Sequence, residues 1–422
     1  MRRVYSVIFA LALPFILARF CWQATRNRSY RDRWRQRLAW YAATPGINSP
    51  LWIHAVSVGE VGAAAPLIRA LRDRYPFRDI LVTTSTPTGF ATVTRQFGET
   101  VYHAYFPYDL PSMVTRFLDR FQPCMLLLME TELWPNVIHQ CHLRGIPALL
   151  VNGRMSERSA RRYQWFQGLT ASMLAELTTV AAQTRSDAER LGKLGVPEAR
   201  LAVTGSLKFD VHLPASVFEE GASIRRDLGT NRPILMAGST RPGEEEILLR
   251  ALRLLRHQFP DILLVLAPRH PERFDTVAEL VKREGWRYAR RSEGGAVSPG
   301  VEIFLLDTMG ELLRFYAASD VAFVGGSLMP LGGHNVLEPA TLGVPVLAGP
   351  HLFNFSEISE KMQRSGALRI VQDAQALAEV AGAWLADTDQ RDAAGRAGRE
   401  IVAHNRGATL AVLDLLTTAG LR

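Results

Sequence analysis

Short apolar runs alternate with longer segments of mixed apolar and polar residues along most of the chain, and this pattern predicts the fold. Runs of the kind found in buried strands occur at 51–55, 80–84, 101–106, 125–129, 148–151, 180–184 and 201–204. A second series occurs at 234–237, 262–267, 303–305, 321–324 and 346–348. Near-continuous apolar strands that alternate with helical patterns are typical of parallel sheets covered by helices. We therefore expect an α/β protein built from two doubly wound, Rossmann-like domains that face a cleft.

The pattern changes between Gly205 and Pro233, where a connecting helix and a turn replace the alternation. A chain of 422 residues is also too long for one ordinary hydrophobic core. We expect a membrane anchor at 1–22, a first domain at 23–210, a second domain at 211–400 and a C-terminal helix at 401–422.

An almost wholly apolar segment, Val4 to Trp22, lies near the N-terminus. Its uninterrupted part is shorter than the roughly 20 residues that a membrane span usually needs, and Pro14 would kink a helix here. Arg2 and Arg3 precede the segment, as in a cleaved signal peptide, but no cleavage site of the small-x-small type follows it. A buried helix of the first domain is the alternative interpretation.

A basic segment follows the apolar one and indicates its orientation. It holds six arginines against one acid, Asp32. The positive-inside rule places such a segment in the cytoplasm, where each basic residue near an anionic leaflet contributes roughly 1 kcal/mol of binding. We expect an uncleaved anchor, either a single span or a shallow insertion, with the rest of the chain cytoplasmic. The arginines are Arg26, Arg28, Arg31, Arg33, Arg35 and Arg37.

Composition narrows the class of partner and the compartment. The formal net charge is +8, from 49 lysines and arginines against 41 aspartates and glutamates. Such a surplus suits an anionic partner but does not choose between a nucleic acid and a membrane. The three cysteines, Cys21, Cys124 and Cys141, have no C-x-x-C spacing. They argue for a reducing compartment and against a structural zinc site or a disulfide framework.

A glycine-rich stretch between a strand and a helix is the most distinctive polar segment. Gly325 to Pro345 has the sequence GGSLMPLGGHNVLEPATLGVP and follows the apolar run 321–324. Glycines allow a sharp turn and a close approach to a ligand, and free N–H groups at a helix start bind anions. Asn335 can donate and accept hydrogen bonds, whereas an ionised Glu338 only accepts them. The pair suits sugar hydroxyls beside a phosphate; the alternative is a simple turn.

Three other loops in the second half also follow strands, at the end where ligands bind in doubly wound sheets. Ser239 lies in GSTRPGEE, and Arg269 lies in PRHPER between two prolines. Arginine forms forked contacts to phosphate or carboxylate, although a solvated surface charge is the alternative. Gly310 and Glu311 lie in DTMGEL at a predicted helix start, where N–H groups are free.

The first half places acids at its strand ends. Glu60 follows Gly59 at a helix entry, where a carboxylate meets the helix dipole favourably. Glu60 is either a helix-start acid or a general base that removes a proton from an acceptor hydroxyl. Glu130 and Glu132 follow another strand and are either catalytic or structural. Lys208, in TGSLKFD near the domain boundary, is placed to face a ligand anion.

Together these motifs resemble the Kdo transferases of Gram-negative bacteria. The resemblance extends over HAVSVGE, TTSTPTG, ETELWPN, NGRMSERS, TGSLKFD, GSTRPGEE, APRHPER, DTMGEL and GGHNVLEP, from Leu51 to about Gly366, and includes the anchor. It implies a GT-B fold whose last helix crosses back to the first domain. It also implies transfer of 3-deoxy-D-manno-octulosonic acid (Kdo) from CMP-Kdo to the lipid A precursor lipid IVA, in lipopolysaccharide biosynthesis at the cytoplasmic face of the inner membrane.

The resemblance also assigns roles to individual residues. Glu60 matches the family's proposed catalytic base in S-x-G-E. The C-terminal domain would bind CMP-Kdo, and the N-terminal domain would bind the acceptor. We expect no metal or other cofactor, because no D-x-D motif follows a strand and a CMP leaving group carries a single phosphate. The residues expected at the nucleotide are Arg269, Gly310, Glu311, Gly333, Asn335 and Glu338, with Ser239 and Lys208 as weaker candidates.

Two other functions fit parts of the pattern. A UDP-sugar transferase or epimerase of similar fold would use the same kind of glycine loop, but the anchor is not expected of a soluble epimerase. A non-catalytic binder of nucleic acid would use the positive charge. However, the arginines cluster beside the apolar segment and no platform of stacking aromatics accompanies them, so we expect no nucleic-acid partner.

Overall fold

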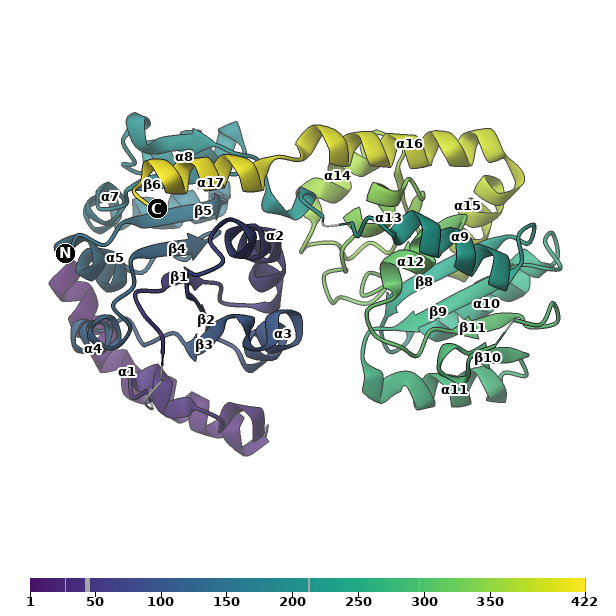
Figure 1. Cartoon of the computed structure of the whole chain (residues 1–422), viewed down its shortest axis with the longest axis horizontal. Helices are drawn as coiled ribbons and strands as arrows, with labels where there is room; N and C mark the ends of the chain where they lie inside the picture. The colour runs from purple at the N-terminus through teal and green to yellow at the C-terminus, as the bar shows by residue number, and fades with distance from the viewer. Residues whose placement is uncertain (27, 42–45, 212, 296, 422) are drawn as a thin grey trace. The chain divides into compact units, whose positions relative to one another are not determined.

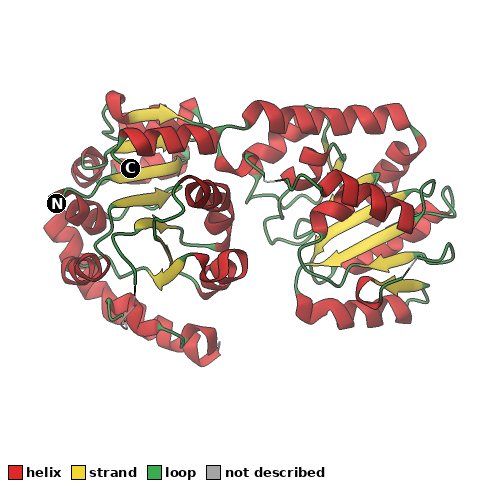
Figure 2. Ribbon diagram, viewed as in Figure 1, coloured by secondary structure: helices red, strands yellow, loops and turns green. Residues whose placement is uncertain are grey.

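The computed structural model describes residues 1–26, 28–41, 46–211, 213–295 and 297–421. The chain divides into two compact units. Unit 1 comprises Met1–Asp210 and Arg406–Arg422, and unit 2 comprises Val211–Asn405. Within each unit, parallel strands form a central layer and helices cover it (Figures 1 and 2). The predicted α/β class, with two doubly wound parallel sheets, is confirmed.

The described residues of unit 1 form a seven-stranded parallel sheet in the order β3-β2-β1-β4-β5-β6-β7. Strand β1 is central, and its residue Ile53 is level with Val82 of β2 and Leu127 of β4. Ile53 packs into the core on one face of the sheet, and Trp52 packs into the core on the other. Burial on both faces explains why these strands are continuous apolar runs. The strands are β1 (Leu51–His54), β2 (Ile80–Thr84), β3 (Tyr102–Tyr105), β4 (Met125–Met129), β5 (Ala148–Gly153), β6 (Thr179–Ala182) and β7 (Leu201–Val203).

Helices connect these strands and begin at residues suited to helix starts. Thr86, Ser156 and Thr184 each accept a hydrogen bond from a first-turn N–H group, which satisfies a donor that has no partner within the helix. The helices of unit 1, apart from those near the termini, are α2 (Val58–Arg74), α3 (Pro87–Phe97), α4 (Pro111–Phe121), α5 (Pro135–Leu143), α6 (Glu157–Gln164), α7 (Gln167–Ala175) and α8 (Arg185–Lys193).

The described residues of unit 2 form a second seven-stranded parallel sheet, in the order β10-β11-β9-β8-β12-β13-β14. Its two edge strands, β10 and β14, were not predicted. Each has three residues and contains an arginine, so neither forms an apolar run. The strands are β8 (Ile234–Thr240), β9 (Leu263–Pro268), β10 (Tyr288–Arg290), β11 (Ile303–Leu305), β12 (Val321–Val324), β13 (Val346–Ala348) and β14 (Leu368–Ile370).

Eight helices cover or connect the described strands of unit 2, and some are short. The two helices that follow the loops after β11 and β12 have six residues each. The helices are α9 (Val217–Leu228), α10 (Glu244–Arg256), α11 (Phe274–Arg283), α12 (Leu312–Ala317), α13 (Leu337–Leu342), α14 (Ser356–Arg364), α15 (Ala374–Ala386) and α16 (Thr388–Asn405).

The last helix, α17 (Ala408–Thr418), belongs to unit 1 although α16, which precedes it, belongs to unit 2. At the start of α17, the N–H groups of Gly407 (2.8 Å) and Thr409 (2.6 Å) donate hydrogen bonds to the Asp210 carboxylate. Leu413 and Leu416 then join the core that α2 shares with the sheet. The chain therefore returns to its first unit through a capped and buried helix.

The apolar N-terminal segment forms one long helix, α1 (Arg2–Arg26), which continues through Pro14. Its length and hydropathy are sufficient to cross a membrane. Within α1, all of which the structure describes, no residue is buried, so it is not a core helix. One side lies on unit 1, where Ser6 Oγ donates to Asn136 Oδ1 (3.1 Å). The other side exposes apolar residues, including Leu11 (69%) and Phe15 (77%).

The basic segment after α1 is only partly a surface feature. Arg37 lies in the 3-10 helix η2 (Trp34–Leu38) and is buried. Its guanidinium lies 4.2 Å from the ring centre of Tyr105, and its Nη1 donates to the Ser85 carbonyl (2.8 Å). Burial lowers the pKa of this guanidinium. Arg37 therefore holds the segment on unit 1 and is not available to a lipid.

Candidate active site

Glu60 lies in the first turn of α2, directly after the central strand β1. Its Oε2 accepts the N–H of Val56 (2.8 Å), and its Oε1 accepts the hydroxyl of Ser57 (3.3 Å). The carboxyl is largely removed from solvent. Burial and then the neighbouring charges of Glu132 and Glu130 raise the pKa of Glu60 to about 8. Glu60 is therefore a carboxyl group that exchanges its proton near neutral pH.

Glu132 follows β4 and lies against aromatic side chains. Trp134 Nε1 donates to Glu132 Oε2 (2.9 Å), and His54 Nε2 lies 3.8 Å from the same oxygen. Burial, with a smaller contribution from Glu130, raises the pKa of Glu132 to about 7. Burial also lowers the pKa of His54 to about 3, so His54 is neutral at pH 7. Its ring stacks on Phe106 at 3.7 Å between centroids.

Lys208 lies in unit 1, beside one of the acids. It belongs to the 3-10 helix η5 (Leu207–Phe209), and its Nζ forms an ion pair with Glu130 Oε1 (3.1 Å). Glu130 has a positive φ of 54°, which is unusual for a residue other than glycine. We call Glu60, Glu130 and Glu132 the acidic cluster. The strained turn places the Glu130 side chain where Lys208 balances part of the negative charge of this cluster.

The strand ends of unit 2 bring two arginines and two histidines together. Arg241 follows β8, Arg269 and His270 follow β9, and His334 follows β12. Arg241 Nη1 contacts His270 Nε2. Burial and then the charges of Arg269, Arg241 and His270 lower the pKa of His334 to about 4. Among the described residues, Arg241 Nε and His334 Nε2 are buried atoms with no hydrogen-bond partner. We call these four residues the cation cluster, after the positive charge of the two arginines.

The glycine loop lies between β12 and α13. The N–H of Gly333 donates to the carbonyl of Gly326 (2.8 Å), and Gly326, Gly332 and Gly333 all have positive φ. Asn335 uses both ends of its amide, since Nδ2 donates to Glu338 Oε1 (3.2 Å) and Oδ1 accepts the N–H of Leu337 (3.1 Å). Burial raises the pKa of Glu338, while Asn335 and the charge of Arg269 lower it. Asn335 and Glu338 are thus an interacting pair near the cation cluster.

Glu311, Gly310 and Ser239 lie at other strand ends of unit 2. The Glu311 carboxylate pairs with Arg291 (2.8 Å) and also accepts from Thr308. The Arg291 hydrogen bond lowers the pKa of Glu311 most. A Cβ at Gly310 would meet no atom within 4 Å, so open space surrounds this turn. Ser239 has a positive φ of 59° at the register shift between β8 and β9.

Two fully buried acids, Glu244 and Glu245, are important residues that the sequence did not single out. They begin α10, and their burial is not visible in a run of three glutamates at a helix start. Glu245 forms two hydrogen bonds with Arg273, at 2.7 and 3.1 Å.

Among the described residues, no group of three or more His, Cys, Asp or Glu could hold a metal ion.

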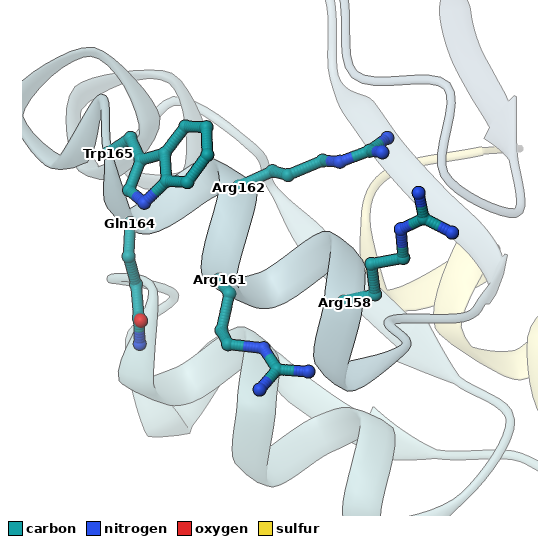
Figure 3. A pocket seen from close by; sticks show the side chains of 5 residues that line it. All are labelled: Arg158, Arg161, Arg162, Gln164 and Trp165. Carbon is teal, nitrogen blue, oxygen red and sulfur yellow. The ribbon is translucent and has the colours of Figure 1, made fainter.

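An open surface pocket on unit 1 is lined by a basic and aromatic group of residues (Figure 3). It lies at α6 and the residue after it. Trp165 is 80% exposed and the adjacent Phe166 is 64% exposed. Exposed rings beside arginines are typical of surfaces that meet anionic lipid. The lining residues are Arg158, Arg161, Arg162, Gln164 and Trp165.

Comparison with known proteins identifies the family. Residues 32–211 match the family model described as 3-Deoxy-D-manno-octulosonic-acid transferase (kdotransferase). The 3-deoxy-D-manno-octulosonic acid transferase of Haemophilus influenzae is 41% identical over 418 residues, and that of Bordetella pertussis is 38% identical over 430 residues. Each alignment covers 98% of both chains.

A solved structure of a different enzyme shares the fold. UDP-GlcNAc 2-epimerase from Neisseria meningitidis matches 87% of this chain and 100% of its own, with a TM-score of 0.56 and 14% identity. At this identity the likeness shows the fold alone. The two near full-length relatives, by contrast, confirm the family predicted from the motifs. The chain belongs to the 3-deoxy-D-manno-octulosonic acid transferase family.

Proposed function

We propose that this Kdo transferase takes Kdo from CMP-Kdo and transfers it to the lipid A precursor, with Glu60 as general base. The observation that carries the proposal is the environment of Glu60. Its carboxyl lies at the carboxyl end of the central strand, and its pKa is raised to about 8 by burial and by neighbouring acids. A base is most effective when its pKa is close to the working pH.

The reaction that fits these groups is an inverting displacement at the anomeric carbon of Kdo. The acceptor hydroxyl oxygen forms the new bond to this carbon, and its proton passes to Glu60. The bond between the anomeric carbon and the phosphate oxygen breaks, and CMP leaves with the electron pair. Glu132 contributes by raising the proton affinity of Glu60, since a like charge disfavours ionisation.

The donor fits the cation cluster of unit 2. CMP-Kdo carries one phosphate and one carboxylate, and Arg241, Arg269, His270 and His334 provide cationic or N–H donor groups at adjacent strand ends. Two of their nitrogen atoms are buried and have no partner among the described residues. An anion would satisfy them. We propose that these groups balance the charge of the departing CMP without a metal, and that Asn335 and Glu338 contact donor hydroxyls.

The acceptor is a lipid, and unit 1 has features that suit a membrane surface. We propose that α1 and the residues around α6 hold the enzyme at the cytoplasmic face of the inner membrane. α1 contacts unit 1 through Ser6 near its start, and through Phe20, whose ring lies 5.2 Å from the guanidinium of Arg37. Contacts this far apart favour a helix that lies in the leaflet over one that crosses it.

The proposal is tested by incubating the enzyme with CMP-Kdo and a tetra-acylated lipid A precursor and measuring the product mass. Glu60→Gln is expected to lower kcat by at least about 100-fold, because general base catalysis contributes about 10² to 10⁴. Binding of CMP, measured by calorimetry, should be unchanged. Glu99→Gln, at an exposed acid of the same unit, serves as the matched control.

Each part of the proposal has an outcome that contradicts it. Normal turnover by a folded Glu60→Gln protein would remove Glu60 from the role of base. Tighter binding of UDP than of CMP would contradict the donor and favour a UDP-sugar enzyme. Absence of Kdo from the lipid product of the unmodified protein would contradict the acceptor.

A further inference from the structure

The Glu244 side chain, at the start of α10, is fully buried. Its carboxylate accepts four backbone hydrogen bonds. Oε1 accepts the N–H groups of Ser327 and Leu328, both at 2.9 Å. Oε2 accepts the N–H groups of Gly326 (2.8 Å) and Arg241 (2.9 Å). A buried carboxylate is costly unless it is fully hydrogen-bonded, and here both oxygens have two donors.

Three of these donors are consecutive residues in the turn after β12. Successive backbone N–H groups in a turn form a concave site for an anion, called a nest. In this protein the anion in the nest is the carboxylate of Glu244. The N–H groups of residues 326–328 are therefore already occupied, and a phosphate of the donor must bind elsewhere.

Glu244 also joins the two backbone segments that carry part of the cation cluster. One segment is the turn after β8, which it holds through the N–H of Arg241. The other is the glycine loop, where the carbonyl of Gly325 accepts the N–H of His334 (3.1 Å). The His334 ring lies against the turn, since a Cβ at Gly326 would lie 2.9 Å from it.

We propose that Glu244 is a positioning residue for the donor site. Its carboxylate fills the nest after β12 and fixes the backbone of Arg241 and of the loop that bears His334, so that both side chains meet the phosphate of the donor. This inference rests on the proposed function for the identity of the donor. The inference goes beyond the proposed function by assigning the nest to an internal acid instead of the nucleotide.

The test compares Glu244→Gln with Glu246→Gln, which changes an exposed acid two residues later in the same helix. A glutamine presents its NH₂ group to two of the four N–H donors, whichever way the amide is turned. Amide exchange of residues 326–328, measured without ligand, should become faster in Glu244→Gln and stay unchanged in Glu246→Gln. The KM for CMP-Kdo should rise by about ten-fold or more, from the loss of two hydrogen bonds, while the acceptor KM stays unchanged.

Unchanged amide exchange together with an unchanged donor KM would overturn the inference. A lower kcat with both KM values unchanged would also overturn it, because that is the result of a lower fraction of folded enzyme. If Glu244→Gln does not fold, Glu244→Asp, which keeps the charge but is one methylene too short, is measured in the same way. Failure of the unmodified protein to use CMP-Kdo would contradict the proposed function instead, and the exchange data without ligand would then decide the role of Glu244.

Discussion

At the scale of single residues, burial and neighbouring charges set the proton affinity of the acidic cluster of unit 1. Glu60 lies near Glu132 and Glu130, and Glu130 forms an ion pair with Lys208. Burial and the like charges of Glu132 and Glu130 act together on Glu60. Like charges and burial both favour the protonated form of a carboxyl group, which is why the proton affinity of Glu60 is far above that of a carboxyl in water.

This environment predicts the pH dependence of transfer. If Glu60 must lose its proton to act, kcat/KM rises with pH along a limb whose apparent pKa is about 8. Glu132→Gln removes a like charge, so it lowers the pKa of Glu60 and moves the limb to lower pH. The measurement is the initial rate of transfer between about pH 6 and pH 9.5. The titratable groups that face Glu132 are those of Glu60, Glu130, His54 and Tyr163.

Glu198→Gln, at an exposed acid of unit 1, is the control and should leave the limb in place. A limb that stays near pH 8 in Glu132→Gln would show that Glu132 does not set the proton affinity of the base. A rate that does not vary with pH in the unmodified protein would argue against Glu60 as the group that titrates.

At the scale of elements, α17 is held in place by residues that are far from it in the sequence. Asp210 caps its start, and Val412, Leu413 and Leu416 enter the core beside α2. α2 also carries Glu60 in its first turn. The packing of α17 therefore supports the helix on which the proposed base lies.

Leu416→Ala is expected to destabilise unit 1 by about 3 kcal/mol, as for other fully buried leucines. Amide exchange in β1 and β4 should become faster, and exchange in β8 of unit 2 should stay the same. Leu410→Ala, in the same helix but at a residue that is 66% exposed, should change neither. Equal exchange rates in the two variants would show that α17 does not stabilise the core of unit 1.

At the scale of the whole molecule, the chain combines two α/β units with an exposed apolar surface on α1. The outward side of α1 exposes Val4, Val7, Ile8, Leu11 and Phe15. A soluble protein rarely exposes so many adjacent apolar residues without a partner. In the proposed function this partner is the cytoplasmic leaflet that contains the acceptor.

The orientation of α1 in the leaflet can be tested by thiol labelling on vesicles that contain anionic lipid. Cys21 is exposed near the end of α1, and Arg3→Cys adds an exposed thiol near its start. With protein added from outside, a non-permeant maleimide should label both positions if α1 lies in the leaflet. Protection of the thiol at position 3, with Cys21 still labelled, would show that α1 crosses the bilayer.

Local patterns were sufficient for much of the fold. The central strands of both sheets are apolar runs because they are buried on both faces, so β1, β4, β9 and β12 were predictable within a residue or two. The short edge strands β10 and β14 were not, because most of their residues are not buried and each contains an arginine.

The sequence by itself determined the class of fold, the apolar N-terminal helix, the family, and the position of Glu60 and the glycine loop at strand ends. These features depend on residues that are close together in the chain. Only the tertiary structure decided that Lys208 pairs with Glu130 and that Glu244 fills the turn after β12. Glu244 and Gly326 are 82 positions apart, and they meet because β8 and β12 are neighbours in the sheet. Which strands become neighbours depends on the packing of whole elements. The fold therefore decides which charged side chains meet at each site.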